Sequence, residues 1–98
     1  MISFLAAAAV ACSGMTTTYD LNLSVNLEAR SLQGTLVDSD GGHNSTTFAY
    51  AGLELMDDCL SGDGIEVCLS PDRDQATFWM ALENAGGTRV ETGNLDCQ

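Results

Sequence analysis

Residues 59–68 read Cys-Leu-Ser-Gly-Asp-Gly-Ile-Glu-Val-Cys, and this stretch predicts the fold class. Asp-Gly is a strong signal for a two-residue hairpin turn, because a type I′ turn needs positive φ at both central residues. With Asp63 and Gly64 at the turn, Cys59 faces Cys68 at a non-hydrogen-bonded position, where the backbones approach closely enough for a disulfide. The apolar side chains of the hairpin then share the opposite face. The sequence therefore predicts a disulfide-bonded β-hairpin, whose short loop contributes roughly 2–3 kcal/mol.

The chain before this hairpin has strand periodicity. Residues 19–28 alternate between apolar and polar side chains, which predicts a strand with one buried and one solvated face. Residues 32–37 predict a second, shorter strand. Residues 46–56 predict a third that bends near Gly52, because the apolar positions change parity there.

The chain after the hairpin predicts two more strands. Residues 75–84 form the first, and its buried face is expected to be Ala76, Phe78, Met80 and Leu82. Residues 85–87 suit a three-residue hairpin loop, a register that sets Leu82 against Val90. The last strand would span residues 88–92, and residues 94–98 would form a tail.

Six or seven short strands without a convincing helix predict an all-β fold. We expect a small antiparallel β-sandwich or open barrel, largely up-and-down in strand order. With 98 residues the chain holds one domain at most. The predicted organisation is a signal peptide over residues 1–11, a tether over residues 12–18 and a single β domain over residues 19–98.

The N-terminal segment predicts export. Residues 2–11 are uncharged and mostly apolar, and this run is too short to be a transmembrane helix. Its length suits the apolar region of a signal peptide, and Ala9-Val10-Ala11 is a cleavage site of the A-x-A type. We expect a mature protein in the periplasm, at the outer membrane or cell surface, or in the medium.

The same segment resembles the end of a bacterial lipoprotein signal peptide. Small residues precede Cys12, and Ser13 and Gly14 follow it as the start of a polar tether. The resemblance covers only this segment, and it implies that Cys12 carries a lipid, the one expected attachment to a membrane. The other interpretation is a disulfide between Cys12 and Cys97, which would tie the ends of the mature chain together. The sequence leaves both open.

The charge balance excludes some partners. The chain has 14 acidic residues, three basic ones and a net charge of −11. Nucleic acids and anionic membrane surfaces both favour Lys and Arg, so neither is an expected partner of the folded domain. We expect a protein or an envelope polymer instead.

Candidate reactive groups are few. Asp38, Asp40 and Asn44 beside two glycines form a weak calcium candidate, but the ligand spacing of an EF-hand is not met and these residues also favour turns. His43 is the only histidine, and no serine lies in a nucleophile elbow. We therefore predict no enzyme, no metal and no cofactor.

Trp79 is the candidate contact residue. On a strand over residues 75–84 it lies on the polar face, where it either contacts a partner or is covered by a second sheet. The leading hypothesis is a non-catalytic exported cell-envelope domain that binds a protein or a surface polymer. A secreted inhibitor or effector module is the second hypothesis, and a surface assembly subunit is the third.

Overall fold

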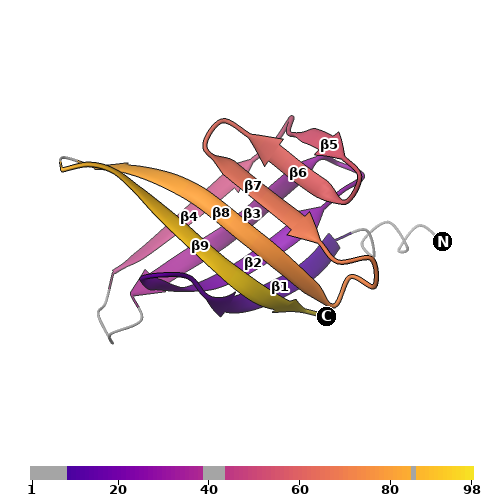
Figure 1. Cartoon of the computed structure of the whole chain (residues 1–98), viewed down its shortest axis with the longest axis horizontal. Helices are drawn as coiled ribbons and strands as arrows, with labels where there is room; N and C mark the ends of the chain where they lie inside the picture. The colour runs from indigo at the N-terminus through magenta and orange to yellow at the C-terminus, as the bar shows by residue number, and fades with distance from the viewer. Residues whose placement is uncertain (1–8, 39–43, 85) are drawn as a thin grey trace.

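The computed structural model describes residues 9–38, 44–84 and 86–98, and this part of the chain folds as antiparallel β-structure (Figure 1). No helix that could span a membrane occurs in these ranges. The strands are β1 (Ala9–Met15), β2 (Tyr19–Asn26), β3 (Ser31–Asp38), β4 (Ser45–Tyr50), β5 (Glu54–Met56), β6 (Cys59–Gly62), β7 (Ile65–Leu69), β8 (Gln75–Asn84) and β9 (Gly87–Cys97).

All nine strands belong to one sheet, in the order β4-β3-β2-β1-β9-β8-β7-β6-β5. Each strand pairs with its neighbour along the chain except β4 and β5, and the first and last strands pair with each other. The arrangement is therefore an up-and-down ring of strands that is open between β4 and β5. Figure 1 shows the sheet curled into a half-barrel, so one face is concave and the other convex.

The concave face carries the hydrophobic core. Because side chains alternate across a sheet, every second residue of each strand points inward. Val25, Leu60 and Val67 have no exposed surface, and Leu21, Ile65 and Met80 have almost none. A curled sheet packs its inner face against itself, so no second layer is required for burial.

The predicted fold class is confirmed, as are the pairings of the hairpin over residues 59–68. Cys59 pairs with Cys68, and Gly62 pairs with Ile65 across the Asp-Gly turn. The bend near Gly52 is also present, because this residue has a φ of 67° and separates β4 from β5. The expected buried face of β8 is correct, with Ala76, Phe78 and Met80 buried and Leu82 packed against the core.

The described residues form nine strands rather than six or seven, for two reasons. The bend at Gly52 divides one expected strand into β4 and β5. In addition, β1 contains residues 9–11 of the expected signal peptide and residues 12–15 of the expected tether. This strand pairs with β2 along its whole length and with β9 at Cys12 and Ser13. Pairing on both sides satisfies the backbone hydrogen bonds of a segment with few large side chains. Residues 1–8 of the expected signal peptide lie outside the described residues.

The expected register of the last hairpin is wrong by one residue. Ala81 pairs with Val90, Leu82 pairs with Arg89 and Asn84 pairs with Gly87, so the loop has two residues rather than three. A slip of one residue moves every side chain of a strand to the other face. Val90 therefore lies on the convex face with 43% of its surface exposed.

The expected tail over residues 94–98 is also wrong, because β9 continues to Cys97. Leu95 and Cys97 point inward and are buried, while Asp96 pairs with Ser13 of β1. This C-terminal half of β9 completes the sheet between β1 and β8.

Candidate binding surface

Trp79 lies on the convex face of the half-barrel. Its neighbours Phe78 and Met80 point into the core, so the alternation of β8 turns the Trp79 side chain outward. The register places Glu66 of β7 on one side of it and Thr92 of β9 on the other. With 39% of its surface exposed, Trp79 offers part of its ring to a partner. No strand of the described chain covers this face, and the contact role of Trp79 stays a prediction.

A shallow hollow beside the indole gives this surface its shape. It is lined by Ser61 and Gly62 of β6, Ile65 and Glu66 of β7, and Trp79 of β8. The hydroxyl of Ser61 and the carboxylate of Glu66 lie opposite each other in the register of β6 and β7. An aromatic face, a carboxylate and a hydroxyl therefore border the same depression.

Apolar groups extend the surface on both sides of Trp79. On one side, Val90 of β9 lies diagonally opposite Trp79. Ala81 of β8, which pairs with Val90, lies beside it. On the other side of Trp79, the next row of outward side chains contains the Cys59–Cys68 disulfide and, beside it, Met56 of β5. Met56 is 68% exposed, so this convex surface combines apolar contact area with polar groups.

Carboxylates surround this surface. Strands β5 to β8 and the turns between them carry one arginine, Arg73, which forms a salt bridge with Asp58 at 3.1 Å. The same segment carries eight acidic residues, namely Glu54, Asp57, Asp58, Asp63, Glu66, Asp72, Asp74 and Glu83.

The convex face of β1 to β4 has a different character. Its outward side chains are mainly small or uncharged, and they include Ser13, Asn22, Ser24, Gln33, Thr35 and Thr47. The net negative charge is therefore concentrated on one half of the sheet, which is the half that also carries Trp79.

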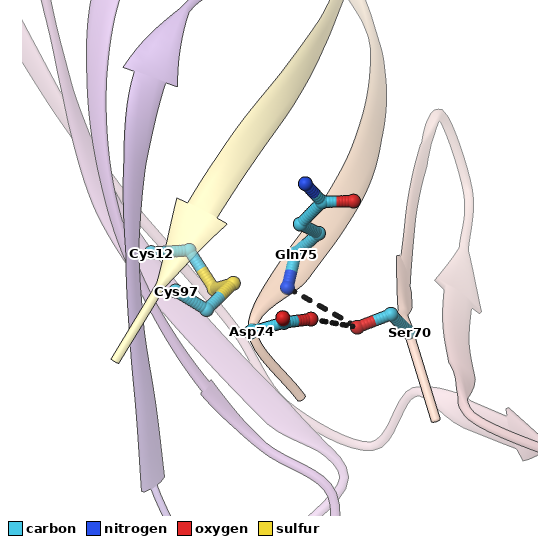
Figure 2. The surroundings of a disulfide bond; sticks show 5 residues. All are labelled: Cys12, Ser70, Asp74, Gln75 and Cys97. Carbon is cyan, nitrogen blue, oxygen red and sulfur yellow. Dashed lines mark hydrogen bonds between the residues drawn. A yellow bond between two sulfur atoms is a disulfide. The ribbon is translucent and has the colours of Figure 1, made fainter. Parts of the chain in front are cut away.

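The Cys12–Cys97 disulfide lies on the opposite, concave face (Figure 2). It joins β1 to β9, and its cysteines are only 3% and 8% exposed. The N–H of Cys97 donates to the carbonyl of Asp74 at 2.8 Å, at the start of β8. In the same turn, the Ser70 hydroxyl donates to the Asp74 carboxylate at 3.0 Å. One sulfur atom cannot form both a disulfide and a thioether to lipid, so the two sequence interpretations of Cys12 exclude each other in one molecule.

The calcium candidate is only partly described. The side-chain amide of Asn44 donates to Oδ2 of Asp38 at 3.4 Å, which uses one oxygen of that carboxylate. Asp40 and His43 lie outside the described residues. Among the described residues, no group of three or more His, Cys, Asp or Glu side chains is arranged to hold a metal ion.

A buried carboxylate was not anticipated from the sequence. Glu91 of β9 has no exposed surface and accepts a hydrogen bond from the Thr16 hydroxyl at 2.8 Å. The backbone N–H and the hydroxyl of Thr18 donate to its two oxygens, each at 2.9 Å. Nε of Arg89 lies 3.3 Å from Oε2, and the Arg89 side chain also donates to the hydroxyl of Tyr19.

This network connects the β1–β2 turn to β9, and its carboxylate has donors for both oxygens. Because a buried carboxylate is tolerated only when it is paired and hydrogen-bonded, the arrangement is a structural connection. The sequence signal that could have revealed it is the parity of residues 91, 95 and 97, which places Glu91 on the buried face once β9 is taken as one long strand.

The fold and this surface define a disulfide-bonded, half-barrel β domain with an acidic convex face. Comparisons with protein-family models, with curated proteins and with solved structures find no match to this chain.

Proposed function

We propose that the chain is an exported, non-catalytic domain that binds a positively charged segment of another protein on the convex face around Trp79. The observation that carries this proposal is the half-exposed indole of Trp79 beside Glu66, on the half of the sheet that holds eight acidic residues and one arginine.

The chemistry of the surface favours a Lys or Arg side chain. An ammonium or guanidinium group over an indole ring gains about 0.5–1 kcal/mol at an exposed site and more when it is desolvated. The carboxylate of Glu66 lies on the neighbouring strand and supplies the opposite charge. The surrounding carboxylates accelerate the encounter with a basic partner more than they raise its final affinity.

Release without a lipid is the form of export that we favour. The sulfur of Cys12, which a lipoprotein would use for its lipid, is bonded to Cys97. Two disulfides are typical of proteins that mature in an oxidising compartment. The secreted inhibitor or effector hypothesis therefore ranks above the lipid-anchored envelope domain.

The form of export is tested by the intact mass of the protein expressed with its own N-terminus in a bacterium that makes lipoproteins. The expected result is an unlipidated chain with two disulfides. Acyl chains on Cys12 would overturn the released form and would leave Cys97 without its partner.

The binding surface is tested with a synthetic octapeptide of lysine and arginine. Trp79 is the only tryptophan, so its fluorescence reports directly on this surface during a titration. We expect a saturable change that weakens with added salt, because salt screens exposed charges. An octapeptide of glutamate should give no change.

The variant Glu66→Gln and its matched control Glu28→Gln decide where the peptide binds. Both remove one exposed carboxylate, but Glu28 lies in the turn after β2, on the less acidic half of the sheet. Loss of an exposed ion pair weakens binding by roughly two- to fivefold, and we expect this only for Glu66→Gln. Equal dissociation constants for the two variants would contradict the proposal.

A further inference from the structure

A second hollow lies on the convex face, where β8 begins and β9 ends. Its volume is about 440 Å³, within the range of about 300–1,000 Å³ that is typical of small ligand sites. The outward side chains that line it are those of Cys68, Ser70, Gln75, Thr77, Asn94 and Asp96. This β8–β9 hollow therefore opens on the same side of the sheet as Trp79.

The polar groups of the β8–β9 hollow have no partner within the protein. The side chains of Gln75, Thr77, Asn94 and Asp96 are exposed, and in the described part of the chain they form no hydrogen bond or salt bridge. Together they offer one carboxylate, two amide carbonyls and one hydroxyl as hydrogen-bond acceptors. A ligand that displaces water from these groups must supply donors in return.

The turn before β8 fixes the backbone on one side of the hollow (Figure 2). The N–H of Gln75 donates to the hydroxyl of Ser70 at 3.1 Å, and the N–H of Ser70 donates to the carbonyl of Gln75 at 2.9 Å. The Ser70 hydroxyl in turn donates to the carboxylate of Asp74. Because the turn is held by these hydrogen bonds, little order has to be gained when a ligand binds beside it.

The charge of the hollow favours a cation. Asp96 supplies a carboxylate, and none of the described residues that line the hollow is basic. Arg73 lies in the adjacent turn, but its guanidinium is paired with Asp58 at 3.1 Å. Arginine fits these acceptors better than lysine, because its guanidinium carries five donors in a planar fork. Its apolar stem can pack against the Cys59–Cys68 disulfide, which borders the hollow.

The register sets the distance between this hollow and Trp79. Thr77 pairs with Asn94, Gln75 pairs with Asp96, and both rows follow Trp79 on the same face of β8. The row of Asp96 is four residues from the row of Trp79, which corresponds to about 13 Å along the strand. In an extended peptide, two side chains on the same side and four residues apart are separated by the same distance.

We propose that the β8–β9 hollow binds an arginine side chain of the basic segment that contacts Trp79. The partner segment then carries two basic residues four positions apart, the first over the indole and the second beside Asp96. This inference rests on the proposed function, to which it adds the spacing of the two basic residues and the identity of the second.

Two octapeptides of identical composition test the spacing. Each contains one lysine, one arginine and otherwise only glycine and serine, with the two basic residues four positions apart in the first peptide and adjacent in the second. Adjacent side chains of an extended peptide point to opposite sides, so the second peptide cannot fill both sites. In titrations of Trp79 fluorescence at low salt, we expect the first peptide to bind at least about threefold more tightly. Equal dissociation constants would overturn the inference.

The variant Asp96→Asn and its matched control Asp20→Asn locate the second contact. Both remove one exposed carboxylate from a strand by the same substitution, but Asp20 belongs to β2. Asp96→Asn should weaken the first peptide to the level of the second, and Asp20→Asn should leave the difference between the peptides unchanged. An equal effect of both variants would show that Asp96 acts only through the net charge, and the hollow would then not be the site.

The side-chain amide signals of Gln75 and Asn94 report on the hollow directly in nuclear magnetic resonance spectra. We expect both signals to shift with the first peptide and not with the second. If maltohexaose, a neutral oligosaccharide, shifts them at lower concentration than the first peptide does, the arginine assignment is wrong.

The two proposals can be separated by the same titrations. If both peptides change the fluorescence of Trp79 with equal affinity, the basic segment still binds there and only the inference about the hollow fails. If neither peptide changes the fluorescence, the proposed function fails and the inference fails with it.

Discussion

Removal of the Cys12–Cys97 disulfide should destabilise the domain more than removal of Cys59–Cys68. The perturbations are the double variants Cys12→Ala with Cys97→Ala and Cys59→Ala with Cys68→Ala, which leave no unpaired thiol. The two bridges differ in sequence separation, which is 85 for the first and 9 for the second. They therefore restrict the unfolded chain to very different degrees.

The magnitudes follow from the loop entropy of the unfolded chain. The chain-entropy relation gives about 4.6 kcal/mol for the long loop and about 2.7 kcal/mol for the short one at 25 °C. The long bridge should therefore be worth about 2 kcal/mol more. Cys12 and Cys97 are also buried on the concave face, so their replacement by alanine removes core contacts and adds to the difference.

Urea unfolding followed by circular dichroism measures both variants against the unmodified chain. In thermal unfolding, loss of the long bridge should lower Tm by roughly 20–35 °C, because 1 kcal/mol shifts Tm by about 4–8 °C in a domain of this size. Equal destabilisation by the two double variants would refute the reasoning. A larger loss of stability on removal of the Cys59–Cys68 disulfide would refute it as well.

Two further substitutions test the interior. Glu91→Gln should lower the free energy of unfolding by about 1.5–3 kcal/mol in urea, because only one end of the amide can accept the hydrogen bonds that Thr18 and its neighbours donate. An unchanged urea midpoint would show that the carboxylate is not needed for stability. Gly34→Ala should cost about 1–3 kcal/mol, because an added Cβ would lie 2.8 Å from the Phe48 ring, whereas Thr35→Ala on the convex face should change stability by less than about 0.5 kcal/mol. Similar unfolding midpoints for these two alanine variants would argue against close packing at Gly34.

The parts of the fold that depend on local chemistry could be predicted from the sequence. The Asp-Gly turn gives the pairing of Cys59 with Cys68, and the alternation of residues 19–28 gives β2. In both segments the turn residues and the apolar pattern specify the same structure. The inward face of β8 follows from its alternation in the same way.

The parts that depend on distant pairing could not be predicted. Residues 9–15 and 94–97 contain few large apolar side chains, and they become strands because β1 and β9 pair with each other and with β2 and β8. Tertiary context of this kind overrides local propensity. The loop at residues 85–86 shows a related limit, since glycine-rich turns of two and three residues differ by one step of register.

The sequence predicts one residue of the candidate surface, Trp79, but not the residues that surround it. The parity of β8 identified Trp79 as outward-facing relative to Phe78 and Met80. Whether a second sheet would cover it depended on how the sheet closes, and no sequence pattern contains that information. The hollow beside Glu66 likewise exists only after β6, β7 and β8 are placed side by side.

The position of the Cys12–Cys97 bridge has a mechanical consequence. A pulling force applied at Cys12 and at Cys97 passes from one strand to the other through two sulfur atoms. The hydrogen-bonded sheet between these residues carries none of that load, so the domain cannot be extended while the bridge is intact. Under a force applied at these two residues, the domain would keep its length while the bridge is intact. Reduction of this one disulfide would allow the domain to unfold and extend.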